Sequence, residues 1–352
     1  MAIEHALTFR RILLTRMRFI GDVVLTTPAI RSVREALPGA YVAYLGEKSA
    51  VSLLERNPFV DELISFDFSR PSLLEQTRVA LLLRRRKFDL AVDFYGNPRS
   101  ALLTWLSGAA VRVGPDRPGR GALYTVRVPG ESAAQTAVAF HNSYIAAAGI
   151  SPTNVTPEIF LTDEERRQAE HVLRRTEKGG QPIDPAGCIV GLHPGASWPA
   201  KRWLPERFAH LAAKLSSEFG AQIIITSGPR DEEATDAVRH RCTSPVRVVR
   251  NLPLRQLAAV ISRCSAFVSN DAGPMHIAAA LGVPTIGLFG PGEEDIWFPY
   301  DPRLGHCALR KDVPCHPCHL DFCNRHGDGY MECMTKLTTD EVFAAVKRTL
   351  TR

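Results

Sequence analysis

The sequence predicts an α/β protein with two doubly wound, Rossmann-like domains that face a central cleft. The chain has 352 residues, which suits two domains of about 150 residues each. Short β-branched or aliphatic runs alternate with longer helical patterns, as in stacked βαβ units, and a Gly- and Pro-rich segment interrupts them near the middle. Strands separated by helices at this spacing form parallel sheets that helices cover on both faces.

The first domain is expected to span residues 1–165. Its first strand leads into a helix that Pro38 and Gly39 close. The expected strands are 11–15, 41–45, 63–66, 89–94, 111–114 and 123–128, and the expected helices are 22–36 and 72–87.

A charged helical pattern then runs into Gly-Gly and two prolines, which is the composition of a linker, and we place the linker at 166–187. The second domain is expected at 188–337 and repeats the alternation, and a last amphipathic helix falls within 338–352. The expected strands are 188–192, 222–226, 246–249, 266–269 and 285–289, and the expected helices are 204–219, 254–262, 276–281 and 339–349.

The composition is that of a globular protein, with 45% hydrophobic and 23% charged residues and a mean hydropathy of −0.08. These values exclude a disordered chain, a collagen-like repeat and a disulfide-dense mini-protein. No apolar stretch approaches the roughly 20 residues of a membrane-spanning helix, and the apolar run near the N-terminus is too short for a signal peptide. The sequence therefore predicts a cytoplasmic protein.

The net charge of +6 is too small to indicate a nucleic-acid-binding protein by itself. Residues 1–160 carry 19 Lys and Arg against 14 Asp and Glu, so most of the excess lies in the first half. This asymmetry indicates an anionic ligand or surface there, with solvated helix faces as the alternative. The run Arg84-Arg85-Arg86-Lys87 suits the C-terminal dipole of a predicted helix, and contact with anionic lipid is its alternative.

Ligands of doubly wound sheets bind outside the carboxyl ends of the strands, so the segments that follow the strands hold the candidate site residues. Asp22 follows the first strand at the start of a helix. A carboxylate at this point either caps the helix or, facing the cleft, acts as a general base. No G-x-G-x-x-G motif occurs here, so the usual dinucleotide fingerprint is absent.

One loop of the second domain, HPGASWPAKRW, has the composition of a phosphate-binding loop. Its small residues let backbone amides approach an anion, and Lys201 and Arg202 can neutralise that anion. A Pro-rich turn with exposed cations is the alternative.

A second loop, SNDAGPMH, leads into a helix. Gly273 permits close backbone approach and the following proline suits the first helical turn, so the helix N-terminus can hold a diphosphate. Asp271 beside it can bind a hydroxyl-rich group such as a sugar. His276, taken alone, is more typical of a packed or capping histidine.

Four of the eight cysteines lie close together in the sequence, at Cys315, Cys318, Cys323 and Cys333. Four thiolates in such a span suit a structural zinc or iron ion. The spacing differs from the common zinc-finger signatures, so reduced buried thiols and disulfides stay open as alternatives. The cluster favours a reduced compartment over a secreted scaffold.

Taken together, the motifs resemble the ADP-heptose:lipopolysaccharide heptosyltransferases of glycosyltransferase family 9. The resemblance covers most of the chain, and its carriers, in order, are RFIGDVVLTTPAIRSVREALPGA, DFYGNPRSALLTWLSGA, HPGASWPAKRW and SNDAGPMHIAAALGVPTIGLFGP. It implies a GT-B fold, with the acceptor on the first domain and the nucleotide sugar on the second. It also implies inverting transfer of heptose from ADP-heptose to the lipopolysaccharide inner core, with no nucleic-acid partner, in the cytoplasm. Peripheral contact with the inner membrane stays open.

The resemblance also assigns site residues, and Asp22 falls in the Gly-Asp turn that holds the family's catalytic base. The implied donor-binding residues are Gly195, Ala196, Ser197, Lys201, Asp231 (a ribose ligand, with Glu232 as the neighbouring alternative), Asp271, Ala272, Gly273 and His276. The cations near the strand ends of the first domain, expected to bind acceptor phosphates or carboxylates, are Arg16, Arg18 and Arg99. No cofactor is expected for catalysis, because Lys201, the loop amides and the helix N-terminus would stabilise the leaving ADP.

One departure from the family pattern concerns the donor. Relatives often carry Thr or Ser pairs where this chain has Gly195-Ala196-Ser197. The second hypothesis is therefore a glycosyltransferase of the same fold with another nucleotide sugar, or with a surface glycan or a protein as acceptor. The third is a non-catalytic, metal-clustered binding protein, and the intact set of Asp22, Lys201 and Asp271 argues against it.

Overall fold

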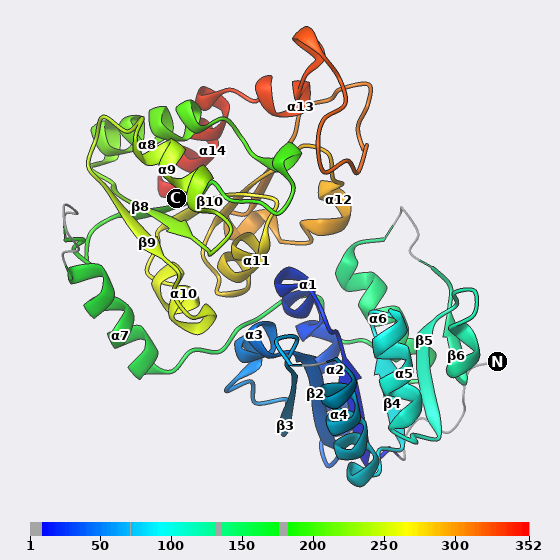
Figure 1. Ribbon diagram of the computed structural model, residues 1–352. Coiled ribbons are helices and arrows are strands. Elements are labelled where there is room, and N and C mark those ends of the chain that lie inside the picture. The colour runs from blue at the N-terminus through cyan, green and yellow to red at the C-terminus, as the bar shows by residue number, and fades with distance from the viewer. Residues whose placement is uncertain (1–8, 71, 131–134, 176–181, 352) are drawn as a thin grey trace. The chain divides into compact units, whose positions relative to one another are not determined.

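The computed structural model describes residues 9–70, 72–130, 135–175 and 182–351. The chain divides into two compact units, Met1–Phe160 and Leu161–Arg352. Each unit is built on a parallel sheet with helices beside it (Figure 1). The predicted α/β class with two parallel sheets is confirmed. None of the described helices combines the length and the apolar content that crossing a bilayer requires.

The first unit has one six-stranded sheet. Its strands are β1 (Arg11–Thr15), β2 (Tyr41–Glu47), β3 (Glu62–Phe66), β4 (Leu90–Asp93), β5 (Val111–Pro115) and β6 (Val126–Val128), in the spatial order β3-β2-β1-β4-β5-β6. Its helices are α1 (Ile20–Leu25), α2 (Thr27–Ala36), α3 (Lys48–Val51), α4 (Ser72–Arg86), α5 (Pro98–Leu106) and α6 (Ala137–Ala147). Because all neighbouring strands pair in parallel, their carboxyl ends share one edge.

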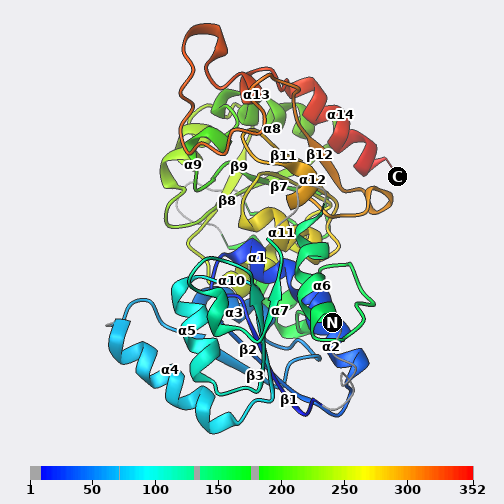
Figure 2. The same cartoon turned by 90° about the vertical axis from the view of Figure 1, so that its right-hand side faces the viewer.

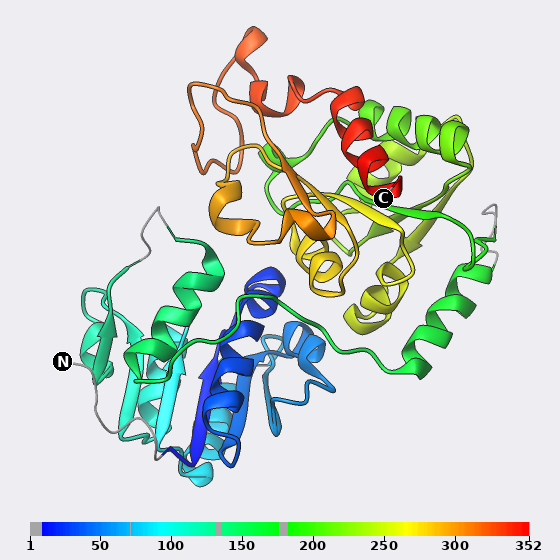
Figure 3. The same ribbon diagram turned by 180° about the vertical axis from the view of Figure 1, so that it is seen from behind.

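Strand β1 shows how the sequence divides between the two faces of this sheet. Ile12 and Leu14 pack with α2 and α6 on one face, while Leu13 packs with α4 and α5 on the other. Figure 1 shows α4 and α5 in front of the sheet, and Figure 3 shows α2 and α6 on the opposite face. The interior of a strand buried on both faces is apolar on both sides, which is why Ile12, Leu13 and Leu14 form a continuous rather than an alternating apolar run.

The second unit repeats this plan. Its strands are β7 (Ile189–His193), β8 (Gln222–Ser227), β9 (Val246–Arg250), β10 (Ala266–Asn270), β11 (Thr285–Leu288) and β12 (Cys307–Leu309), in the order β12-β11-β10-β7-β8-β9. Its helices are α7 (Asp163–Arg174), α8 (Pro205–Phe219), α9 (Glu232–Arg239), α10 (Leu254–Ile261), α11 (Gly273–Ala280), α12 (Glu294–Trp297), α13 (Glu332–Thr335) and α14 (Thr339–Leu350). Helices α8 and α14 bury their apolar faces against one side of the sheet.

Two of the segments expected from the sequence have a different structure, and strand β12 and helices α5, α6 and α9 were among the elements not expected. The helix expected at 22–36 is two helices, because Pro28 has no N–H to donate to the carbonyl of Val24 and the hydroxyl of Thr27 donates to it instead, at 2.7 Å. The segment assigned to the linker, 166–187, begins inside α7, which packs against α10, and its residues 176–181 lie outside the described residues.

Candidate active site

Asp22 lies in the first turn of α1, just beyond the carboxyl end of β1. Its Oδ1 pairs with Nη2 of Arg16, and its Oδ2 accepts the backbone N–H of Phe19 at 3.0 Å. The side chains of Asp22 and Arg16 are each only 10% exposed. Two hydrogen bonds in a buried setting hold the carboxylate in one orientation. Asp22 therefore supports the helix start and also presents a fixed carboxylate at the edge of the sheet.

The guanidinium of Arg16 is fixed by the end of β4 as well. Its Nη1 donates to the carbonyl of Phe94 at 3.0 Å, and its central carbon lies 4.5 Å from the ring centroid of Tyr95. Nearby on α6, burial and the charge of Arg16 lower the pKa of His141 to about 4. At neutral pH the imidazole is therefore uncharged, and Arg16 is the cation that faces Asp22.

Arg18 and Arg99, the other two cations expected to bind the acceptor, meet on one aromatic ring. The guanidinium carbon of Arg18 lies 4.0 Å from the ring centroid of Phe68, and that of Arg99 lies 5.0 Å from it. Arg18 also donates to Glu47 at 3.1 Å, and Arg99 donates to the hydroxyl of Ser72 at 2.9 Å. These contacts hold two cations at the same edge of the sheet as Asp22. Phe68 was not predicted, although an aromatic residue two positions after the end of β3 could have indicated it.

In the second unit, the two predicted phosphate-binding segments come together. Nζ of Lys201 lies 2.5 Å from Oδ2 of Asp271 and 4.4 Å from the ring centroid of Trp198. Gly292, in the segment after β11, adjoins both charged groups, because a Cβ built there would lie 3.2 Å from Oδ2 of Asp271 and 3.8 Å from Nζ of Lys201. Three loops at the carboxyl edge of the second sheet therefore converge on one ion pair. Trp198 and Gly292 were not predicted.

Asp231 packs against the loop that follows β7. Its Oδ2 accepts the N–H of Gly228 at 3.0 Å and lies 3.9 Å from Nε2 of His193. A Cβ at Gly195 would lie 2.3 Å from the Asp231 carboxylate, so only glycine allows this approach. Burial lowers the pKa of His193, and the imidazole is hydrogen-bonded through Nδ1 to Thr226. Asp231 thus lies beside the predicted donor loop.

The helix predicted at the second loop begins at Gly273. Ala272 is its N-cap and has no side-chain acceptor. Pro274 has no N–H and the N–H of Met275 donates to the carbonyl of Ala272 at 3.1 Å, so within the described residues the first turn of α11 offers the N–H of Gly273 to another partner. His276 is buried, and its Nδ1 lies 2.7 Å from the hydroxyl of Tyr300, so packing and this hydrogen bond help to hold its ring. In the first loop, Ala196 is buried and its carbonyl accepts from Arg202, while Ser197 is exposed.

Comparisons with known proteins show the family to which the chain belongs. Residues 77–325 match the model of glycosyltransferase family 9 (heptosyltransferase). The chain belongs to this family. The span that matches includes Lys201, Asp231 and Asp271, whereas Asp22 and Arg16 precede it.

Individual relatives of this family 9 glycosyltransferase cover nearly its whole length. Lipopolysaccharide heptosyltransferase 2 of Salmonella typhimurium is 28% identical over 315 residues, 85% of this chain and 86% of the relative. Lipopolysaccharide heptosyltransferase 1 of Pseudomonas aeruginosa is 28% identical over 326 residues, 89% and 87% of the two chains. The crystal structure of a family 9 glycosyltransferase from Veillonella parvula is 25% identical, covers 99% of both chains and has a TM-score of 0.84. The E. coli ADP-heptose heptosyltransferase II structure, at 22% identity and a TM-score of 0.77, covers 97% of this chain and 98% of that one, and the expected GT-B fold is confirmed.

The cysteine-rich segment of this family 9 chain contacts the two loops predicted to bind the donor. The carbonyl of Asp321 accepts the N–H of Ala200, next to Lys201, at 3.0 Å. The N–H groups of Cys318 and His319 both donate to the carbonyl of Pro291 at 3.2 Å, and Nε2 of His316 lies 2.9 Å from the carbonyl of Gly292. The segment therefore ties together the two loops that surround the Lys201–Asp271 pair.

The four clustered cysteines are all free thiols. Sγ of Cys323 accepts the N–H of Met331 at 3.3 Å, and Sγ of Cys315 lies 3.6 Å from Nη1 of Arg325. Burial and the charges of the other three thiols raise the pKa of Cys333 to about 11. In the part of the chain that the structure describes, no three His, Cys, Asp or Glu side chains meet in a metal-binding arrangement.

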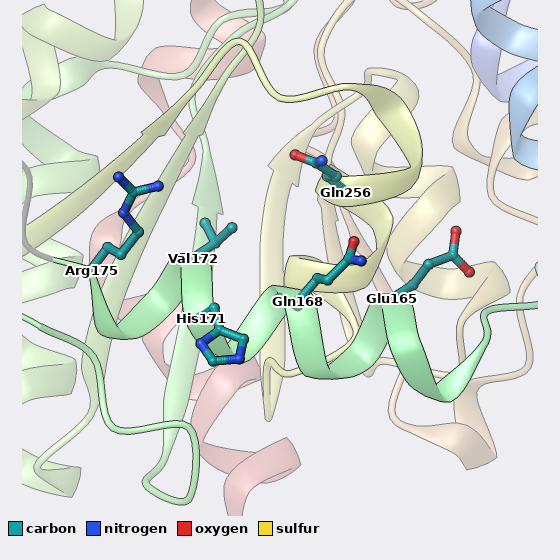
Figure 4. A pocket seen from close by; sticks show the side chains of 7 residues that line it. Glu165, Gln168, His171, Val172, Arg175 and Gln256 are labelled. Carbon is teal, nitrogen blue, oxygen red and sulfur yellow. The ribbon is translucent and has the colours of Figure 1, made fainter.

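A pocket of about 250 Å³ lies elsewhere in the second unit, between α7 and α10 (Figure 4). Its lining contains no predicted site residue and consists of Glu165, Gln168, Ala169, His171, Val172, Arg175 and Gln256. The Arg255 guanidinium bonds the carboxylate of Glu165 and lowers its pKa to about 2. This ion pair joins α7 to α10, and we assign the pocket a packing role.

Proposed function

We propose that the protein is an inverting heptosyltransferase that moves heptose from ADP-heptose to the inner core of lipopolysaccharide. In this reaction, an acceptor hydroxyl oxygen forms a bond to the anomeric carbon of the donor. The bond from that carbon to the β-phosphate oxygen breaks, and ADP leaves with the electron pair. The carboxylate of Asp22 takes the hydroxyl proton as general base. Arg16 holds Asp22 in position for this transfer.

The observation that carries the proposal is the Lys201–Asp271 ion pair beside the N-terminus of α11. Lys201 is the cation that would meet the charge that develops on the β-phosphate, together with the N–H of Gly273 at the start of α11 and N–H groups of the loop at Gly195, Ala196 and Ser197. Asp271 then exchanges its bond with Lys201 for hydroxyls of the sugar. Asp231 is proposed to bind the ribose, and Gly273 and His276 shape the diphosphate site.

On the first unit, Arg18 and Arg99 are proposed to bind acidic groups of the acceptor, and Arg16 contributes its charge beside them. Phe68 keeps the first two guanidinium groups together, which suits a phosphate or carboxylate with several oxygens. We place the reaction in the cytoplasm, with the enzyme peripheral on the inner membrane, where a lipid-anchored acceptor is available.

The donor assignment is tested by calorimetric titration of the protein with ADP, GDP and UDP in the presence of EDTA. We expect ADP to bind with at least tenfold preference, roughly 1.4 kcal/mol, over the other two nucleotides. Binding in EDTA is expected because Lys201 and backbone N–H groups supply the positive charge. A transfer assay with ADP-heptose and a lipopolysaccharide acceptor then follows.

Preference for UDP or GDP would keep the glycosyltransferase fold and reject heptose transfer from ADP-heptose. It would favour the second candidate, a transferase for another nucleotide sugar, which the unusual Gly195-Ala196-Ser197 loop makes the leading alternative. Failure of all three nucleotides to bind would reject the transferase assignment of these loops.

We also propose that Cys315, Cys318, Cys323 and Cys333 hold a structural zinc or iron ion, for which Cys315 and Cys323 would give up their present hydrogen bonds. We expect elemental analysis to find about one metal ion per chain. The variant Cys318→Ser/Cys333→Ser should lose it, whereas Cys242→Ser, outside the cluster, should retain it. Metal-free protein with four titratable thiols in the cluster would reject the metal and support the reduced-thiol alternative.

A further inference from the structure

Helix α4 presents a second, outward apolar face that none of the described residues of its own unit covers. Its inner side buries Val79 and Leu83 completely. On its outer side, Leu74 is 69% exposed and Leu81 is 55% exposed. Leu73 is exposed beside them, and Arg85 continues the line of Leu74 and Leu81 because residues four and seven apart share a helix face. Figure 2 shows α4 on the outside of the first unit.

The neighbouring helix extends this face. Trp105, near the end of α5, is 49% exposed. Gly108, three residues after Trp105, lies against the guanidinium of Arg84. A Cβ built on Gly108 would be only 1.8 Å from Nη1 of Arg84. The end of α5 that carries Trp105 therefore adjoins the basic end of α4. Exposed tryptophan beside arginine and lysine is typical of surfaces at a membrane–water interface.

The cations at the end of α4 divide into two groups. Arg78 and Arg86 are paired with Glu75 and Glu62. Within the described residues, Arg84, Arg85 and Lys87 form no ion pair with an acidic side chain. These three cations are thus available to an external anionic surface, and the first unit as a whole has a positive balance of charge.

The other end of α4 adjoins the proposed acceptor residues. The hydroxyl of Ser72, the first residue of α4, accepts from Arg99, and the exposed leucines follow at once. An acceptor whose acidic core lies at Arg99 would thus have its lipid portion next to Leu73 and Leu74. This link rests on the proposed function, whereas the apolar and basic character of the face does not.

We propose that this surface, which we call the α4 face, binds the anionic phospholipid surface of a membrane. The α4 face consists of Leu73, Leu74, Leu81, Arg84, Arg85, Lys87 and Trp105. Its apolar side chains would enter the headgroup region and its cations would contact lipid phosphates. A second copy of this chain is a poorer occupant, because a symmetric dimer through this face would bring the same unpaired cations of both copies together.

Sedimentation with vesicles tests this proposal without donor, acceptor or turnover, so its outcome is independent of the proposed transfer reaction. We expect the protein to sediment with phosphatidylcholine vesicles that contain phosphatidylglycerol, to do so poorly with phosphatidylcholine alone, and to be released as salt rises. The double variant Leu74→Ser/Leu81→Ser should bind at least about tenfold more weakly, because its apolar contact is lost. Arg85→Gln/Lys87→Gln should also bind more weakly and depend less on salt.

Leu304→Ser is the matched control, since Leu304 is 56% exposed in the second unit and should be dispensable for vesicle binding. Thermal melting at the wild-type temperature shows that each variant is folded. Equal binding of wild type and the leucine double variant, or no preference for phosphatidylglycerol, would overturn the proposal. A concentration-dependent dimer that the leucine variant abolishes, with no vesicle binding, would assign the α4 face to a second copy instead.

Discussion

Replacement of Asp22 by asparagine is expected to reduce heptosyl transfer by about 10²- to 10⁴-fold, the usual contribution of a general base. Asparagine has nearly the same shape, but its amide cannot accept a proton at neutral pH. ADP affinity should be almost unchanged, because the proposed donor residues belong to the second unit. The measurement is single-turnover transfer together with calorimetric ADP titration.

The partners of Asp22 define the control for this variant. Loss of the carboxylate leaves Arg16 buried without its anion, and breaking a buried pair costs roughly 3–5 kcal/mol of folding free energy. A thermal melt must therefore show that the asparagine variant is folded at the assay temperature. Arg16→Lys keeps a cation but loses the bond to Phe94 or to Asp22, so it should lower the transfer rate less than Asp22→Asn. Wild-type transfer by a folded Asp22→Asn variant would reject the general-base role.

Local patterns predicted the sheets well, because buried parallel strands are continuous apolar runs that stand apart from their surroundings. Prediction from apolar patterns fails for α6. Nearly every residue between Ala137 and Ile145 is buried, so the apolar residues do not recur with the period of 3.6 that identifies an amphipathic helix. Helix α5 was also missed, although Asn97 caps it by accepting the N–H of Ser100 at 2.7 Å and Pro98 occupies its first position. An Asn followed by a Pro is typical of a helix N-terminus, so this sequence could have predicted the start of α5.

In the candidate site too, some features were predictable from the local sequence and others depend on tertiary contacts. Asp22, Lys201 and Asp271 were predicted because each comes after a strand, and parallel strands bring such segments to the carboxyl edge of their own sheet. Phe68 under Arg18 and Arg99 depends on how β3 and α5 pack, and sequence spacing contains no such information. The same holds for the brace from Asp321 to Ala200, which joins residues far apart in the chain. Tertiary contacts of this kind decide how a site is held, whereas strand ends decide where it lies.

Replacement of Lys201 by methionine is expected to weaken both donor binding and turnover. One preorganised charge at a developing oxyanion typically contributes about 10²- to 10³-fold to turnover, and we expect that loss here. ADP affinity should fall by at least tenfold, about 1.4 kcal/mol, because Asp271 then faces the diphosphate without its cation. Calorimetry with ADP and steady-state kinetics with varied donor measure the two effects.

Lys214 provides a matched control within the same unit. Its Nζ lies 2.7 Å from Oδ1 of Asp340 and 4.5 Å from the ring centroid of Phe343, which repeats the Asp and aromatic contacts of Lys201. Lys214→Met should bind ADP and turn over as the wild type does, because Asp340 is exposed and an exposed pair contributes little. Unchanged donor kinetics in Lys201→Met would reject its phosphate role.

The double variant Lys201→Met/Asp271→Asn separates repulsion from lost attraction. Removing the Asp271 charge relieves the repulsion of the diphosphate, so ADP affinity should recover in part relative to Lys201→Met. Turnover should not recover, because neither residue then supplies positive charge to the leaving β-phosphate, and the sugar loses its carboxylate partner. Full recovery of turnover would mean that Lys201 serves only to neutralise Asp271, and the leaving-group charge would then have to be met by the N–H groups of α11 and the loop after β7 alone.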